Sequence, residues 1–526
     1  MKYKFRIASI VFLGVLLIGF YSCKKQLNQT PAYGLNSAVV YGDANNYINV
    51  LAKIYSGLSV TGIDGPAGNA DISGIDEGFS AYIRVLYNLQ ELPTDEAVCG
   101  WNDPGIPEMN RMQWSADNSF VKAMYSRIFY QITLCNEFIR ESSDENMEER
   151  GFTAAQKEEI TLYRNEARFL RALAYTHAMD LFGNVPFVTE ENAVGSFVPE
   201  QIQRTELFDY IEGELMDLET LLLDPAACPY GRASKAAVQY LLAKNYLNAE
   251  VYSGSPRFGD CVTYCQRVID WGTFILDDNY QDLFLADNNT SPEIIFPVTF
   301  DGLYTQTYGG TTFLVHASVG GSMIAADYGI SGGWQGLRAT RPFVEKFPDS
   351  TLDARFLFYR DGQDLDITNL GTFTEGYGFP KFKNVTSTSQ PGSNVAGGFV
   401  DVDYPMFRLG DIHLMYAEAA LRGGGSVATG EILLNQLRER AYGNNSFNLS
   451  GVTLDDILDE RAREMSWECT RRTDLIRFGK YTDGTYVWPF KGGDLNGTSA
   501  SSHLELFPIP TSDIILNPNL VQNVGY

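Results

Sequence analysis

Histidine and cysteine are scarce in this sequence, which has four of the first and seven of the second among 526 residues. It contains no HExxH zinc signature, no phosphate-binding P-loop and no GxGxxG dinucleotide fingerprint. So few cysteines in a long chain do not make a disulfide scaffold. The sequence therefore predicts no cofactor, no metal site and no catalytic residue. Glycoside hydrolysis needs only two placed carboxylates, so the 65 acidic residues leave a secreted glycosidase open as an alternative.

Positive charge is also in short supply, because 40 Lys and Arg stand against 65 Asp and Glu, for a formal charge of −25. Such an acidic surface repels phosphate backbones, which argues against a nucleic-acid partner. It argues mildly against sulfated or uronic polymers as well, unless a local basic patch such as Arg338 and Arg341 offsets it. Aromatic residues, in contrast, make up 13% of the chain. Flat rings on a surface can serve recognition.

Long apolar runs are missing except at the N-terminus. There Lys2, Lys4 and Arg6 precede fifteen apolar residues, Ile7 to Tyr21. That length is too short to span a bilayer but suits the core of a signal peptide. The run ends at Ser22-Cys23, which is similar to the processing site of bacterial lipoproteins. We expect residues 1–22 to be a lipoprotein signal peptide and Cys23 to carry a lipid anchor to the membrane. The alternative is an ordinary secretory signal followed by an incidental cysteine.

Two groups of segments have the apolar periodicity of helices. In the first group, Ala167, Leu170, Ala174 and Ala178 form one alanine-rich stripe that lets helices approach closely. Gly183 is expected to end that helix, and Ser234 to cap a later one. We predict helices over residues 45–58, 118–140, 157–182, 205–223, 234–252, 409–419, 431–442 and 454–468.

The rest of the chain has a different texture. Residues 61–117 and 278–404 are rich in Gly, Thr, Ser, Asn and aromatic residues and lack a long amphipathic period. The sequence therefore predicts a mostly α fold in which tetratricopeptide-like paired helices carry an irregular, partly β, loop-rich cap. Residues 23–526 form a single unit in this interpretation, with the scaffold mainly at 35–60, 118–277 and 405–480. Loops held by a rigid scaffold are where binding residues concentrate.

Five strings along the chain carry a family resemblance. They are NEARFLRALAYTHAMDLFGNVPF (165–187), GRASKAAVQYLLAKNYLNAE (231–250), FRLGDIHLMYAEAALR (407–422), ERAREMSWECTRRTDLIRFGKY (460–481) and FPIPTSDIILNPNLVQNVGY (507–526). Together, and in this order, they resemble the SusD/RagB family of outer-membrane nutrient-binding lipoproteins. The resemblance covers essentially the whole mature chain. One departure is Cys469, which stands where the family usually has a glycine.

The resemblance implies a SusD-like fold and a role in nutrient uptake. The protein would sit at the cell outer membrane, lipid-anchored and surface-exposed, and would capture glycans for a SusC-like TonB-dependent transporter. The helical repeats would face the transporter and the cap loops would meet the ligand. Because part of the family serves peptide uptake, peptides are the alternative cargo; an exposed strand edge in the cap would then pair with the peptide backbone.

Glycan binding needs apolar rings that stack on sugar C–H faces, with amides and charged groups at the rim. Trp101 and Asn102 lie in a Gly/Pro loop, and Trp334 follows Gly332-Gly333. Tyr304 and Tyr308 occupy a Gly/Thr loop, and Tyr82 and Arg84 follow the first long loop. These are the candidate ligand-binding residues, and packing inside the fold is the alternative for each of them.

Three carboxylates, Glu460, Glu464 and Glu468, recur at four-residue steps and would share one helical face. A metal site would need further ligands, whereas five arginines crowd the same segment. We therefore predict arginine–carboxylate pairs that lock helices together. Cys261 and Cys265 have the same four-residue spacing and are expected to be small buried residues.

Overall fold

The computed structural model describes residues 37–62, 64–192, 195, 197–348 and 351–526. The predicted signal peptide and the lipidation site Cys23 lie outside these residues. As predicted, the fold is mostly helical, and strands are short. The helices are α2 (Ser37–Val40), α3 (Tyr47–Ser56), α4 (Tyr82–Gln90), α5 (Ile106–Arg111), α6 (Ser119–Glu141), α7 (Asp144–Glu149), α8 (Ala154–Phe182), α9 (Arg204–Leu221), α10 (Lys235–Leu247), α11 (Ala249–Ser253), α12 (Phe258–Asp270), α13 (Gly310–Ala317), α14 (Arg341–Val344), α15 (Leu409–Ala419), α16 (Val427–Tyr442), α17 (Leu454–Glu464), α18 (Arg471–Arg477) and α19 (Thr511–Leu516).

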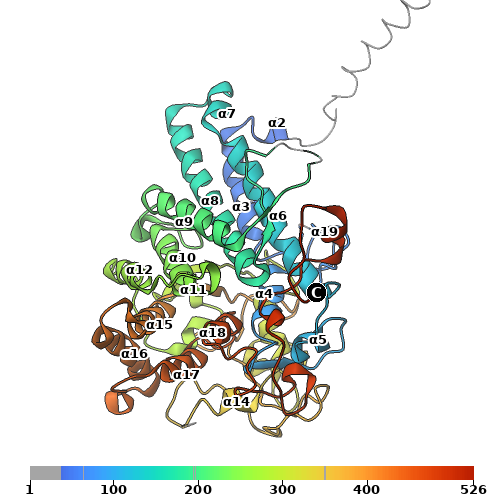
Figure 1. The fold of residues 1–526 in the computed structure, drawn as a ribbon, viewed down its shortest axis with the longest axis vertical. Helices are drawn as coiled ribbons and strands as arrows, with labels where there is room; N and C mark the ends of the chain where they lie inside the picture. Colours follow the sequence, from blue (N-terminus) through green and yellow to red (C-terminus); the bar gives the residue numbers. More distant parts are fainter. Residues whose placement is uncertain (1–36, 63, 193–194, 196, 349–350) are drawn as a thin grey trace, which may run out of the picture.

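The long helices pack as successive neighbours. Helix α6 lies against α8, α8 against α9, α9 against α10, α10 against α12, α12 against α15 and α15 against α16. Figure 1 shows this stack running from α8 at the top, through α10 and α12, to α15 and α16 at the lower left. Buried alanines along α8 and α10 let the helices approach closely, as the stripe predicted. Consecutive helices therefore form the paired-helix scaffold.

Local sequence signals fix several helix ends. Thr153 and Gln156 form a reciprocal capping box at the start of α8. Gly183 ends the same helix with a positive φ of 71°, as expected. Ser234 precedes α10 but its hydroxyl makes no capping hydrogen bond, so that prediction was wrong. The segment predicted as one helix over 234–252 is two, because the chain leaves helical geometry at Asn248.

The end of α17 also differs from the prediction. The helix was expected to reach Glu468 but ends at Glu464. Beyond it, Trp467 and Cys469 adopt left-handed φ values of 60° and 59°. Cys469 therefore takes the backbone conformation that a glycine adopts without strain. The tight turn that follows leads into α18.

Buried arginine–carboxylate pairs hold this region together, as predicted. Among the five arginines of the segment itself, Arg463 pairs with Glu460 at 2.7 Å, but most partners of the three glutamates come from elsewhere in the chain. Arg355 donates to Glu460 and Glu464 at 2.6 and 3.1 Å, and Arg408 donates to Glu464 and Glu468 at 2.7 Å each. Arg355, Arg408 and the three glutamates are all fully buried. Although Glu468 lies outside α17, the turn still directs it into the same cluster. Cys261 and Cys265 are buried free thiols on α12, as expected.

The cap contains more regular structure than predicted. Helix α4 lies within 61–117, where no helix was expected, and all nine of its residues are buried. With nine residues, α4 is shorter than the window of roughly 11 to 18 residues over which a helical period is recognised. Three antiparallel strand pairs complete the cap and its junctions: β1 (Ala97–Cys99) with β5 (Leu337–Ala339), β2 (Val185–Pro186) with β3 (Gln201–Ile202), and β4 (Ile294–Val298) with β6 (Tyr404–Arg408).

Candidate ligand-binding site

The strand pair β1–β5 brings two candidate tryptophans together. Cys99 pairs with Leu337, and the Gly100 N–H continues the ladder by donating to the Gly336 carbonyl at 2.9 Å. Trp101 follows this ladder on one side and Trp334 precedes it on the other. The Trp101 indole N–H then donates to the Trp334 carbonyl at 3.1 Å. Two loops that are 233 positions apart are thereby fixed to each other.

The two indole rings are neighbours, with centroids 6.4 Å apart and planes tilted by 47°. Both tryptophans are partly exposed residues. Gly336 allows this arrangement, because a Cβ at that position would lie 2.6 Å from the Trp101 ring. We call Trp101, Trp334 and Tyr308 the tryptophan surface.

Tyr308 is the third ring of the tryptophan surface. Its ring meets Trp334 edge-on at 6.3 Å and Phe399 at 5.5 Å, and 38% of the residue is exposed. Tyr304 lies four residues earlier in the same loop and is 84% exposed. The loop is shaped by Asp301, whose Oδ1 accepts from the N–H groups of Leu303 and Tyr304. The Tyr304 side chain is therefore largely open to solvent.

Arg84 packs against Trp101 from inside the fold. It is only 7% exposed, and its guanidinium lies 4.7 Å from the Phe313 ring centroid and 5.5 Å from that of Trp101. Burial lowers the pKa of Arg84 to about 10, so it stays charged at neutral pH. A cation held against aromatic rings in this way stabilises their position.

His316 is a supporting residue that the sequence did not identify. Its ring stacks on Trp334 with centroids 4.6 Å apart and planes 22° apart. Its Nδ1 lies 2.8 Å from the Gly332 carbonyl. Burial lowers the pKa of His316, so the ring is neutral at pH 7. Its only sequence signal was a histidine shortly before a double glycine, which is too common to single out.

One of the two remaining candidates packs inside the fold. Tyr82 is fully buried, and its hydroxyl lies 2.7 Å from His177 Nδ1, so it has the packed position that was the alternative to ligand contact. Asn102, next to Trp101, is exposed. Its amide is available at the rim of the tryptophan surface.

The basic patch suggested by Arg338 and Arg341 does not form. Arg338 is fully buried and donates to the carbonyls of Leu370 and Thr372. Arg341 is paired with Asp366 at 2.6 Å and with Glu345 at 3.2 Å. Neither side chain offers a free positive charge to an anionic ligand.

The chain contains one short motif of the serine-hydrolase type. Residues 329–333 read GISGG, which matches the GxSxG pattern of serine hydrolases. In those enzymes the serine sits on a sharp turn between a strand and a helix. Here Ser331 lies in an exposed irregular segment that leads into β5. The match therefore lacks the geometry of a nucleophile.

Metal-binding clusters and membrane-spanning helices are both missing from the described ranges. Among these residues, no group of three or more His, Cys, Asp or Glu side chains is arranged to hold a metal ion. In the same part of the chain, no helix is both long enough and apolar enough to cross a membrane.

A helical scaffold that presents indole rings on its loops is typical of a ligand-binding protein. The SusD family model matches residues 244–526. The starch-binding protein SusD of Bacteroides thetaiotaomicron is 35% identical over 100% of this chain and 99% of its own. SusD-like protein P25 of Formosa agariphila is 25% identical over 99% of this chain and 100% of its own. The chain belongs to the SusD family.

Solved structures show the same fold. A SusD superfamily protein from Parabacteroides distasonis covers 94% of this chain and 100% of its own, with a TM-score of 0.71 and 21% identity. The surface glycan-binding protein A from Bacteroides thetaiotaomicron, solved in complex with laminarihexaose, covers 91% of this chain and 99% of its own, with a TM-score of 0.69 and 20% identity.

Proposed function

We propose that this protein binds glycans at the tryptophan surface and passes them to a SusC-like TonB-dependent transporter in the outer membrane. The observation that carries the proposal is the pair of indole rings from distant loops, fixed side by side and partly exposed. Such rings stack on the apolar faces of sugars. Asn102 and the hydroxyls of Tyr304 and Tyr308 would bind sugar hydroxyls at the rim.

The relatives support this cargo. One is named for starch binding and another was solved with laminarihexaose, and both ligands are neutral glucans. A neutral glycan also suits this chain, because its formal charge is −25. Arg338 is buried and Arg341 is paired with Asp366, so neither would attract an anionic glycan. A neutral glucan is therefore the first ligand to test.

The location and partner follow from the same proposal. A lipid on Cys23 would hold the mature chain at the outer membrane with its cap exposed to the medium. The paired helices would face the transporter. Co-purification of the lipidated protein with a SusC-like barrel from the native membrane, and its loss in a Cys23→Ala variant, would test the anchor and the partner together.

The alternatives have less support. Peptide pairing would need an accessible strand edge, yet β1 and β5 are three residues each, and β5 also bridges Tyr377 through Ala339. Relatives are named as binding proteins, not as enzymes. We therefore propose a binding protein without catalytic activity.

The central test is binding of maltoheptaose and laminarihexaose by residues 24–526, measured by calorimetry. Replacing both Trp101 and Trp334 with alanine should weaken binding at least tenfold, about 1.4 kcal/mol, because the stacking faces are lost. Trp271→Ala is the matched control, since Trp271 follows α12 and donates to Gln239 on the scaffold. Unchanged affinity in the double variant would reject the site.

A further inference from the structure

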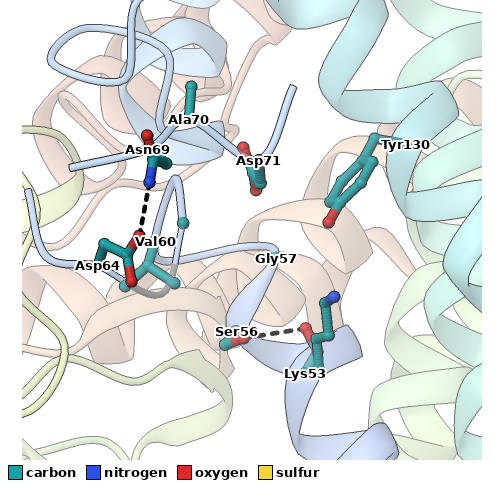
Figure 2. A pocket seen from close by; sticks show the side chains of 10 residues that line it. Lys53, Ser56, Gly57, Val60, Asp64, Asn69, Ala70, Asp71 and Tyr130 are labelled. Atoms are coloured by element: carbon teal, nitrogen blue, oxygen red, sulfur yellow. Dashed lines mark hydrogen bonds between the residues drawn. The ribbon is translucent and has the colours of Figure 1, made fainter. Parts of the chain in front are cut away.

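A pocket lies where two scaffold helices meet the first cap segment, and none of its lining residues belongs to the tryptophan surface. It is a pocket of about 320 Å³ between the end of α3, the middle of α6 and the segment that follows α3. Figure 2 shows the side chains that surround it. It is lined by Lys53, Ser56, Gly57, Val60, Gly62, Asp64, Asn69, Ala70, Asp71 and Tyr130.

Asp71 is held rigidly at one wall of the pocket. Its Oδ2 accepts from Arg127 at 2.6 Å, and its N–H donates to the Thr61 carbonyl at 2.9 Å. Arg127 is anchored in turn by the carbonyl and the hydroxyl of Ser80. The other oxygen, Oδ1, is buried and has no hydrogen-bond partner among the described residues. A buried carboxylate oxygen without a partner is costly unless a ligand or water satisfies it.

Two donor groups on the helices border the same space. In Figure 2 the Tyr130 hydroxyl and the Lys53 ammonium both point into the space beside Asp71. Within the described ranges, neither group has a hydrogen-bond or ion-pair partner of its own. Across the pocket, Asn69 donates to Asp64 Oδ2 at 2.9 Å, which fixes a second carboxylate. Donors, acceptors and one aromatic ring therefore converge on one small space.

We propose that this pocket is a second binding site, for a single neutral sugar ring. Adjacent hydroxyls of a sugar both donate and accept, so they can satisfy Asp71 and Asp64 as acceptors and Lys53 and Tyr130 as donors. The volume lies at the lower end of small-ligand pockets, which run from roughly 300 to 1,000 Å³. Arg127 neutralises Asp71 and Lys53 offsets Asp64, so the pocket offers no net positive charge to a uronate or another anion.

The site is independent of the tryptophan surface. Its residues come from α3, α6 and residues 60, 62, 64 and 69–71, whereas Trp101 and Trp334 lie beside β1 and β5. Occupation of the pocket therefore does not depend on the proposed function of the surface, and each can fail without the other.

The test is saturation-transfer NMR of the folded protein with D-glucose, D-galactose and D-glucuronate as separate probes. We expect saturable binding of at least one neutral hexose, unchanged in Trp101→Ala/Trp334→Ala and weakened at least about fivefold in Lys53→Met/Tyr130→Phe. Lys122→Met, which removes an exposed lysine from α6, is the matched control and should bind like the parent chain.

Three outcomes would overturn the proposal. The first is that no neutral hexose binds. The second is that binding is lost in Trp101→Ala/Trp334→Ala but kept in Lys53→Met/Tyr130→Phe, which would place it at the tryptophan surface. The third is that D-glucuronate binds more tightly than the neutral hexoses, which would contradict a pocket without net positive charge. Thermal unfolding of each variant confirms that it is folded.

Discussion

Gly336 is the residue on which the position of Trp101 depends. A Cβ there would lie 2.6 Å from the indole ring, well inside ordinary contact distance. Gly336→Ala should therefore displace Trp101 while leaving both tryptophans in the chain. We expect glucan affinity to fall by about threefold to tenfold, or ~0.7–1.4 kcal/mol, measured by the same calorimetry.

Gly332→Ala is the control for this substitution. Gly332 lies in the same loop, but a Cβ at that position would meet open space, so affinity should not change. Equal losses in the two variants would show that the loop tolerates no side chain, not that Gly336 seats Trp101.

Single residues also show where sequence reasoning reaches its limit. Trp101 and Trp334 could be chosen because large rings in glycine-rich loops are conspicuous. Tyr82 has the same chemistry but lies inside the fold, because the segment that carries it is a buried helix. His316 and Phe313 could not be linked to Trp334 and Trp101, since the contacts depend on how two distant loops meet.

At the scale of elements, the buried charges around α17 hold scaffold and cap segments together. Arg408 is fully buried and pairs with Glu293, Glu464 and Glu468. Removing one partner from a buried cluster leaves carboxylates uncompensated, which typically costs about 3–5 kcal/mol. We expect Arg408→Met to lower the free energy of unfolding by that amount, as measured by urea denaturation.

Arg341→Met is the matched comparison for the buried arginine. Arg341 also pairs with two carboxylates, but its side chain is 40% exposed. Exposed pairs contribute at most about 1 kcal/mol, so the loss should be small. Similar losses in both variants would contradict the importance of burial.

Helices with apolar residues at three- and four-residue steps were the predictable ones. These stripes located α6, α8, α9 and α15 to within a few residues. The break between α10 and α11 was not predicted, because Asn248 is tolerated in helices and is neither a glycine nor a proline. The early end of α17 escaped as well, since Trp467 and Cys469 rarely take the left-handed conformation that they adopt here.

For the whole molecule, buried carboxyl groups predict a stability that depends on pH in two directions. Burial raises the pKa of Glu96 to about 8, whereas an unfolded glutamate titrates near 4.3. The folded chain therefore keeps a proton that the unfolded chain loses, and stability falls as pH rises from about 5 to 8. Each pH unit in that window costs up to about 1.4 kcal/mol.

Glu96→Gln should remove the contribution of this carboxyl group to the slope. The amide oxygen can still accept from the Trp467 N–H, as Glu96 Oε2 does at 3.1 Å. Urea denaturation at pH 5, 6, 7 and 8 should show the variant gaining stability over the parent chain as pH rises. Parallel profiles for the two proteins would show that Glu96 is ionised in the folded chain.

At acid pH, the dependence of stability on pH has the opposite sign. Burial alone would raise the pKa of Glu460, but Arg355, Arg463 and Arg438 outweigh it and hold the pKa well below its ordinary value. Stability from this carboxylate is complete above the unfolded pKa near 4.3 and is lost as pH falls below it. Together the two effects place the greatest stability near pH 5.

The tryptophan surface is expected to form late in folding. Its two indole rings come from positions 101 and 334, joined by a three-residue strand pair. Closing so long a loop costs chain entropy, and contacts of such wide separation tend to form late. A fragment that lacks either loop would have no complete surface. Ligand binding would therefore report that the molecule has finished folding, and a cell would load cargo only onto finished copies.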